Sequence, residues 1–396
     1  MDEAGAMVTD PAAILVMLLA VLALIFWFGE TVPGKKLFSI VPSLVFCYFL
    51  PTTLTTLGVL PAESVLYDWI KAYLLPTSLM LLILALDVPG IIRLGPKALV
   101  MMLAGTAGVV IGAPIALWIF SSWVPPDTWQ GMTALSGSWI GGGANMVALA
   151  EVAGTSNSMF GMMVIVDVSV ANVWMGVLLY MAGQQQRIDR LTRADMSAIE
   201  DLKRRVAEFT AKTTRVASLT DLMMIAAVGF GGMWLATLAG RYAGNVTAIF
   251  DATIWKFIIV TAIAAALSFT PVRRLEGAGA SRIGSVMLYL LVASIGAHAD
   301  FTHMKEAPVL VAVGAVWMLC HVTVLLAVAW MIRAPIFFVA IGSQANIGGA
   351  ASAPIVASAF HPSLAPVGVL LAILGYVLGT YAGLLAMYLL RTVAGA

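Results

Sequence analysis

The segment GGGAN at residues 141–145 returns in outline as GSQAN at residues 342–346, 201 positions further along the chain. Both match the pattern G-x-x-A-N, and both lie in apolar stretches rich in Gly, Ser and Asn, at residues 132–153 and 335–357. Glycine destabilises a helix interior by about 1 kcal/mol relative to alanine, so glycines followed by Asn make a poor straight helix. We therefore expect each stretch to break and to fold back on itself as a helical hairpin.

The composition is that of an integral membrane protein. Of the 396 residues, 61% are apolar and only 10% are charged, whereas about a quarter of the residues of a soluble domain are charged. The 21 Lys and Arg residues nearly cancel the 20 Asp and Glu residues, so no basic surface is encoded and nucleic-acid binding is excluded. Cys47 and Cys320 each lie in an apolar run, which argues against a disulfide framework or a cysteine metal cluster.

Ten apolar windows are long enough to cross a bilayer, which takes about 20 residues. They fall at residues 12–28, 38–58, 67–86, 98–120, 158–182, 220–239, 252–270, 283–298, 309–332 and 364–390. If both Gly-rich stretches return to the side they entered from, an outside N-terminus places 16 of the 21 Lys and Arg residues in inner loops, as the positive-inside rule favours. If both cross fully, the best twelve-span arrangement gives 14 inside and 7 outside. The charges favour ten spans and two re-entrant hairpins.

The chain divides into two halves of similar organisation. Four spans, a Gly-rich hairpin and one further span follow in the same order in residues 1–182 and in residues 220–396. Because five crossings are an odd number, the second half enters the membrane from the opposite side. The expected fold is an all-α membrane protein of two inverted repeats of five transmembrane helices, each with a re-entrant Gly-rich hairpin. The alternative is a chance match between two helix-packing stretches.

The polar segment between the halves, residues 183–219, carries eight of the 21 cationic residues. Within it Ile199, Leu202, Val206 and Phe209 recur at helical spacing between charged residues, which predicts an amphipathic helix. We expect this helix to lie on the cytoplasmic headgroup surface as a tether. A regulatory or partner-binding role is the alternative.

The hairpin tips are the candidate substrate site. Carriers with inverted repeats bind substrate near the midplane, and non-helical backbone at that depth must line a cavity or be buried in protein. Glycine lets backbone approach a ligand, and Asn offers both an acceptor and a donor. The candidate substrate-binding residues are Gly141, Gly142, Gly143, Asn145, Ser343, Gln344, Asn346, Gly348 and Gly349. The alternative for these glycines is close helix packing, the role we assign to Gly375, Gly379 and Gly383.

Asp167 lies near the middle of the 158–182 span. A carboxyl group there costs roughly 2.5–3.5 kcal/mol on insertion scales and needs a function or a partner. We expect a Na⁺ or proton site formed by Asp167, Asn172, Asn145, Asn346 and Glu151. Two alternatives stay open: a neighbouring helix satisfies Asp167, and Glu151 is a solvated hairpin end. His321 is expected to be a packing histidine with satisfied hydrogen bonds.

These features predict a secondary active transporter of a small organic solute, anionic or zwitterionic, coupled to Na⁺ or H⁺. The second hypothesis is a channel or a pore-like regulator of cell-wall metabolism, which would pass solute without a coupling ion. An enzyme is not expected, because the sequence has no H-E-x-x-H motif and Ser138 has no evident His partner. No cofactor is expected apart from a Na⁺ coupling ion.

The hairpin sequences GGGANMVALAE (141–151) and GSQANIGGAASAP (342–354), with the ten spans and the basic mid-chain loop, resemble the YjcL-like family of bacterial membrane proteins of unknown function. In architecture the chain is similar to the sodium-coupled glutamate and citrate symporters of bacteria. That likeness implies a scaffold part, a mobile part that holds the hairpins, a homodimer formed through the scaffold, and elevator-type alternating access. It also implies a multi-pass protein of the bacterial inner (plasma) membrane, with the lipid bilayer and a small solute as its partners.

Overall fold

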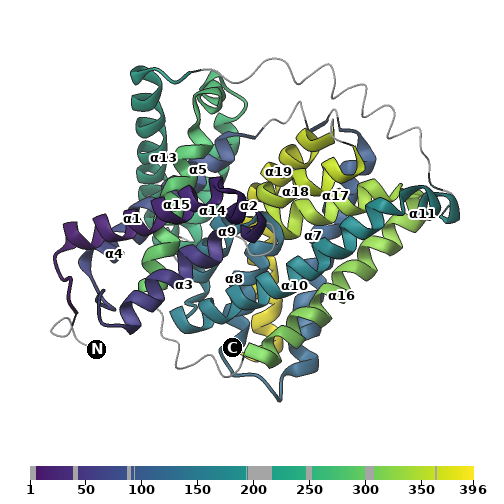
Figure 1. Cartoon of the computed structure of the whole chain (residues 1–396), viewed down its shortest axis with the longest axis horizontal. Helices are drawn as coiled ribbons and strands as arrows, with labels where there is room; N and C mark the ends of the chain where they lie inside the picture. Colours follow the sequence, from purple (N-terminus) through teal and green to yellow (C-terminus); the bar gives the residue numbers. More distant parts are fainter. Residues whose placement is uncertain are drawn as a thin grey trace.

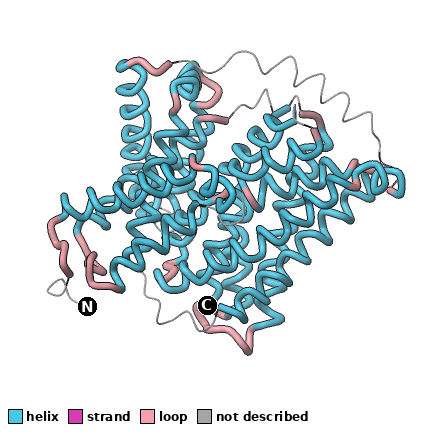
Figure 2. The backbone as a smooth tube through the Cα atoms, in the orientation of Figure 1, coloured by secondary structure: helices cyan, strands magenta, loops and turns pink. Residues whose placement is uncertain are grey.

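The computed structural model describes residues 6–38, 43–86, 91–92, 94–192, 194, 216–246, 252–298, 307–361 and 364–396. Within these ranges the regular structure is helical throughout, and loops and turns join the helices without any strand (Figure 2). The prediction of an all-α chain is confirmed. The predicted amphipathic helix around residues 199–209 lies outside the described residues.

The helices follow one another in the order of the sequence-based expectation. Up to residue 191 they are α1 (Pro11–Glu30), α2 (Val32–Phe38), α3 (Ser43–Thr56), α4 (Val65–Trp69), the π-helix η2 (Ile70–Leu74), α5 (Leu75–Leu84), α7 (Pro96–Phe120), α8 (Thr128–Gly141), α9 (Gly143–Ala153), α10 (Asn157–Gly183) and α11 (Gln185–Leu191). After the polar segment they are α13 (Leu219–Val246), α14 (Ala252–Leu267), the 3₁₀-helix η3 (Pro271–Ala278), α15 (Ala280–His298), α16 (Ala307–Ile332), α17 (Ile336–Ile347), α18 (Gly349–Phe360) and α19 (Ala365–Ala394).

Seven of the described helices are long and apolar enough to cross a bilayer on their own: α1, α7, α10, α13, α15, α16 and α19. Counting each of two bent pairs, α2 with α3 and α14 with η3, as one span raises the number to nine. The other predicted spans correspond to shorter helices, since α3 has 14 residues, α5 has 10 and α14 has 16. A multi-span membrane fold is therefore confirmed, but its spans are not ten uninterrupted rods.

Proline explains where one of the shorter spans is interrupted. Residues 65–84 form a continuous helical run that widens into the π-turn η2 before Pro76 in the first turn of α5. Proline donates no N–H, and its ring clashes with the carbonyl of the residue four positions earlier. That residue is Ala72, inside η2. The wider turn lets the helix continue past Pro76.

The helices form two groups that lie side by side in Figure 1. In the α15 group, α15 packs against α3 and α5, and α13 packs against α14. In the α19 group, α19 packs against α7, α8 and α18, and α16 packs along α7. The groups meet where α9 contacts α5, α14 and α15 and where α19 contacts α5 and α14. The largest cluster of buried apolar side chains runs through both groups.

A glycine stripe brings α19 close to the first Gly-rich segment. A Cβ atom added at Gly375 would overlap the carbonyl oxygen of Ile140, and one at Gly379 would overlap the amide of Asn145. A Cβ at Gly383 would overlap the side chain of Leu149. The predicted packing role of this stripe is confirmed, because only small residues allow two helices to approach so closely.

Candidate functional site

Both Gly-rich stretches are broken at glycine. The first separates into α8 and α9 at Gly142, whose φ is +80°. The second separates into α17 and α18 at Gly348, and Gly349 next to it has a φ of +58°. A positive φ is favourable only for glycine, so Gly142 and Gly349 fix the sites of the two turns.

Within each stretch the second helix folds back along the first. In the first stretch, a Cβ atom at Gly137 of α8 would strike the backbone of Asn145 in α9. In the second, the Nε2 of Gln344 in α17 donates a 2.7 Å hydrogen bond to the Oγ of Ser352 in α18. We call α8 with α9 hairpin 1 and α17 with α18 hairpin 2.

The tips of the two hairpins touch. A Cβ atom added at Gly349 of hairpin 2 would lie 3.8 Å from the Cα of Gly142 in hairpin 1. A Cβ atom added at Gly142 would lie 3.8 Å from Cε1 of Tyr376 in α19. The neighbouring Gly143 faces Leu44 of α3 and Leu288 of α15. The tip of hairpin 1 therefore lies between hairpin 2 and the α15 group.

Asn145 fixes hairpin 1 to α19. Its side chain is fully buried. The Nδ2 donates to the carbonyl oxygens of Gly141 (3.2 Å) and Tyr376 (3.0 Å), and the Oδ1 accepts a 2.9 Å hydrogen bond from the Oγ1 of Thr380. All three bonds are made inside the protein. In this conformation Asn145 anchors the hairpin, so a ligand would reach its amide only if one of these bonds opened.

Asn346 fixes hairpin 2 to α7 in the same way. It is fully buried, and its Nδ2 donates to the carbonyl oxygens of Gly342 (2.7 Å) and Met102 (3.0 Å). Its Oδ1 accepts a 2.8 Å hydrogen bond from the Oγ1 of Thr106. The offset of 201 residues that relates the two Asn residues also relates Gly141 to Gly342. The repeated sequence pattern thus has a repeated hydrogen-bonding role.

Asp167 joins α10 to hairpin 1. Its Oδ2 accepts a 2.6 Å hydrogen bond from the Oγ of Ser138, and its Oδ1 accepts a 2.8 Å bond from the Nε1 of Trp139. The carboxyl group is partly buried and has two donors from the same helix, α8. A neighbouring helix therefore satisfies Asp167 in this conformation, and it does so with one of the two hairpins.

The same face of α10 also reaches hairpin 2. The Nε1 of Trp174 donates a 2.8 Å hydrogen bond to the Oγ of Ser343, which lies 2.8 Å from the Nε2 of His321 in α16. The Nδ1 of His321 faces the carbonyl oxygen of Gly105 at 2.9 Å and so carries the ring proton of the neutral imidazole. His321 and Ser343 are fully buried. His321 is a packing histidine with both nitrogens satisfied, as predicted.

Gln344, near the tip of hairpin 2, has one buried polar atom without a hydrogen-bond partner. Its side chain is 1% exposed, and its Oε1 has no hydrogen-bond partner. A Cβ atom at Gly348 would overlap both the Nε2 of Gln344 and the Oγ of Ser352. Glycine at 348 therefore leaves the space that the Gln344 side chain fills. A buried carbonyl oxygen without a donor is costly and marks a place where a donor or a cation would be favourable.

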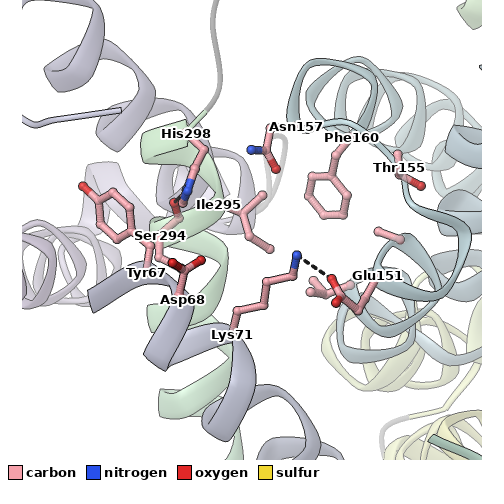
Figure 3. A pocket seen from close by; sticks show the side chains of 12 residues that line it. Tyr67, Asp68, Lys71, Glu151, Thr155, Asn157, Phe160, Ser294, Ile295 and His298 are labelled. Atoms are coloured by element: carbon pink, nitrogen blue, oxygen red, sulfur yellow. Dashed lines mark hydrogen bonds and ion pairs between the residues drawn. The ribbon is translucent and has the colours of Figure 1, made fainter. Parts of the chain in front are cut away.

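The remaining candidate ion ligands lie on different helices. Asn172 is partly buried on α10, and Glu151 at the end of α9 forms an ion pair with Lys71 of η2 (Figure 3). Glu151 thus belongs to a pocket between the two helix groups. Among the described residues no group of three or more His, Cys, Asp or Glu side chains is arranged to hold a metal ion.

Residues 16–393, nearly the whole chain, match a protein family described as "Protein of unknown function (DUF819)". The chain belongs to the DUF819 family. It is also similar to the "Uncharacterized membrane protein YjcL" of Bacillus subtilis (strain 168), with 25% identity over 346 residues, which cover 83% of this chain and 85% of that protein. The predicted resemblance to the YjcL-like family is confirmed, and the family match extends over both hairpins of the DUF819 chain.

Several contacts of this DUF819 site lie on residues that sequence reasoning did not select. Thr106 and Thr380 complete the two Asn anchors, and Trp139 completes the Asp167 contact. Ser138, which the sequence offers as an oxygen ligand near the tip or as a hydroxyl bonded to its own backbone, donates instead to Asp167. A Thr or Trp inside an apolar helix carries no local signal that tells which neighbour it will meet, so these partners could be found only from the fold.

Proposed function

We propose that this DUF819 protein is a secondary active transporter of a small organic solute, anionic or zwitterionic, coupled to Na⁺ or H⁺ and working by elevator-type alternating access. The observation that carries the proposal is the contact between Gly142 and Gly349, the tips of two short helix pairs. Each pair is anchored by a buried Asn to a different long helix. Two converging breaks at membrane depth are what a carrier uses to expose backbone groups to a ligand.

The lengths of the hairpin arms support re-entry from one side. At 1.5 Å per residue, the 14 residues of α8 extend about 21 Å and the 11 or 12 residues of the other arms about 17–18 Å. The hydrocarbon core is about 30 Å thick. An arm of this length ends inside the membrane, where its non-helical tip must be shielded by protein. The opposite tip and α19 provide that shield.

The pattern of helix contacts supports two related halves, residues 1–182 and 220–396, joined by the 183–219 segment. In the order of the chain, α1, α3 and α5 of the first half correspond to α13, α14 and α15 of the second. Contacts between the halves come in exchanged pairs, in which each helix is replaced by its counterpart. The contact of α3 with α15 has its counterpart in that of α14 with α5, and the contact of α1 with α15 in that of α13 with α5. Likewise α9 packs on α19 as α18 packs on α10. Exchanged pairs are expected of halves related by a two-fold axis. With five crossings in each half, that axis lies in the membrane plane and the repeats are inverted.

Asp167 is the residue we assign to ion coupling. An ionised carboxylate accepts hydrogen bonds and donates none, so the bonds from Ser138 and Trp139 suit the charged form. A proton or Na⁺ bound to the carboxylate would compete with these two donors. Ion binding would thereby change how firmly α10 holds hairpin 1. Gln344 Oε1 is the open acceptor that we assign to the solute or the ion at the tips.

The test is coupled uptake by purified protein in proteoliposomes. A ligand that binds the native state raises its melting temperature, so pools of amino acids and carboxylates in Na⁺ or K⁺ buffer identify a solute. We expect that solute to accumulate only under an imposed Na⁺ or H⁺ gradient. Asp167→Asn should abolish accumulation while the melting temperature changes by a few degrees at most. Normal accumulation by Asp167→Asn would contradict the assignment, and flux that ignores both gradients would indicate a channel.

A further inference from the structure

A polar pocket of about 80 Å³ lies where the α15 group meets hairpin 1 (Figure 3). Helix α4 and η2 line one side, α15 another, and the end of α9 with the start of α10 the third. The lining includes Tyr67, Asp68, Lys71, Glu151, Ser294 and His298. At roughly 15 Å³ for each enclosed water, the space holds about five water molecules, or a solute with about five non-hydrogen atoms.

The charged groups of the pocket come from both helix groups. Lys71 of η2 reaches across to the carboxylate of Glu151 at the end of α9, and the two form an ion pair (Figure 3). Asp68 lies one helical turn before Lys71, so its carboxylate is on the same face. The side chains of Lys71 and Glu151 are 51% and 28% exposed. The pair is therefore within reach of a solute from solution.

The position of Lys71 has a structural cause. It lies in the π-turn that the helix forms ahead of Pro76. Single π-turns inside α-helices occur often at functional sites, because the extra residue in the turn changes which side chains face a cavity. The turn places Lys71 and Asp68 together at the pocket, with His298 held nearby by the 3.0 Å contact of its Nδ1 with the Ser294 carbonyl oxygen.

We infer that this pocket, which is separate from the hairpin tips, binds a small zwitterion of the amino-acid type. That the same zwitterion is the transported solute rests on the proposed function. The lining holds one ammonium group and two carboxylates. The carboxylate of the ligand replaces Glu151 on Lys71, and the ammonium of the ligand binds between the carboxylates of Glu151 and Asp68. Each charge then has an opposite partner, as charge complementarity requires.

A ligand with a single charge fits this pocket less well. A carboxylate alone would take Lys71 from Glu151 and leave two neighbouring carboxylates without a cation. A lone cation would bind between Asp68 and Glu151 and balance the net charge of the lining, but it would make no favourable contact with Lys71, whereas a zwitterion contacts all three groups. Because the ligand contacts η2 and α9 together, its binding also links the α15 group to hairpin 1.

The experiment measures binding to the full-length protein in detergent by calorimetry and by thermal shift. The probes are glycine, L-alanine and β-alanine, with acetate and methylammonium as single-charge comparisons at equal ionic strength. We expect saturable binding of at least one zwitterion and at least tenfold weaker binding of both single-charge probes. Lys71→Gln and Glu151→Gln should each weaken zwitterion binding at least tenfold. The double swap Lys71→Glu with Glu151→Lys, which keeps the ion pair, should restore part of it.

The matched controls are Lys35→Gln and Glu30→Gln, which remove an exposed ion pair whose residues do not line the pocket and should leave binding unchanged. Three results would overturn the inference: no binding of any zwitterion, equal binding of acetate or methylammonium, or binding that Lys71→Gln does not affect. Uptake of the bound zwitterion separates this inference from the proposed function. Normal uptake by Lys71→Gln would contradict the zwitterion site but not the transport function. Binding without uptake under any gradient would contradict the transport function but not the zwitterion site.

Discussion

Asn145 and Asn346 hold corresponding places in the two hairpins through the same three hydrogen bonds. Each donates to the carbonyl of the glycine four residues earlier and to one carbonyl of a long helix, and each accepts from a threonine one turn further along that helix. The long helix is α19 for Asn145 and α7 for Asn346. A buried amide with both ends satisfied fixes the height and rotation of a hairpin, so this pair sets where the two tips meet.

Removing either threonine hydroxyl should loosen one anchor. In Thr380→Val and Thr106→Val the Oδ1 of the facing Asn loses its donor, and a buried acceptor without a partner costs about 1–3 kcal/mol. We expect each variant to lower the free energy of unfolding by about that amount in detergent melts. Thr323→Val is the control, because its exposed hydroxyl bonds only the carbonyl of Leu319 in its own helix. Equal stability of all three variants would exclude the anchoring role.

The glycine stripe of α19 gives a second stability prediction. Gly379→Ala would push a methyl group into the Asn145 amide, and overpacking of this kind costs about 1–3 kcal/mol. Gly176→Ala on α10 meets no atom within 4 Å and replaces glycine by a better helix former, so it should leave the melting temperature unchanged or raise it. A Gly379→Ala protein as stable as Gly176→Ala would mean that α19 and hairpin 1 do not pack in this way.

Asp189 of α11 gives a pH dependence outside the membrane-spanning helices. Its Oδ1 accepts a 2.7 Å hydrogen bond from the N–H of Ile336, the first residue of α17, and its side chain is buried. Burial raises the pKa of this carboxyl, although the bonds from Ile336 and Gln185 act in the opposite direction. The folded protein therefore holds this proton more firmly than the unfolded chain.

It follows that the contribution of Asp189 to the free energy of unfolding is greatest below about pH 3.9, the ordinary value for Asp, and falls as the pH rises towards the raised pKa. Above that value the contribution is constant. Asp189→Asn removes the titration but keeps an acceptor for Ile336. Across this window the melting temperature of the parent should fall relative to that of the variant. Parallel curves for the two proteins would refute the prediction.

The inverted arrangement predicts which side each hairpin enters from. Ser122, in the loop before hairpin 1, should face the outside, and His361, after hairpin 2, should face the cytoplasm. We expect Ser122→Cys to react with an impermeant maleimide in right-side-out vesicles and His361→Cys to react only in inverted ones, each in a Cys47→Ala, Cys320→Ala background. Labelling of both from one side would show that the halves are not inverted.

The breaks in the hairpins could be predicted from the sequence because glycine acts locally. Gly142 and Gly349 have the positive φ that a tight turn needs; Gly142 lies inside the first G-x-x-A-N segment, whereas the second break falls at Gly348 and Gly349, just after the second copy, which is helical. The π-turn before Pro76 could also have been predicted, since proline perturbs its own helix. Mean hydropathy does not register this proline and describes residues 67–86 as one ordinary span.

The partners of the polar side chains could not be predicted in this way. Helix α10 is apolar around most of its circumference, so nothing in its periodicity tells which face Asp167 turns to hairpin 1 or that Trp174 will meet Ser343. The ion pair of Lys71 with Glu151 depends on how the two helix groups lie against each other. In a chain whose helices are apolar on every side, helix rotation is set by packing and not by a polar surface.

The contact between the hairpin tips can be measured directly with cysteines. In the Cys47→Ala, Cys320→Ala background, Gly142→Cys and Gly349→Cys place one cysteine at each tip, with 3.8 Å between a Cβ at 349 and the Cα of residue 142. Both positions have a positive φ, which strains a cysteine, so the pair is used only where its melting curve shows a folded protein. A protease site inserted in the 183–219 segment separates the halves. After oxidation and cleavage in membranes, we predict that the halves stay joined on a non-reducing gel, whereas the pair Gly154→Cys with Gly349→Cys lets them separate. Halves that separate equally in both pairs, from protein that is folded and fully oxidised, would contradict convergence of the tips and with it the transport site.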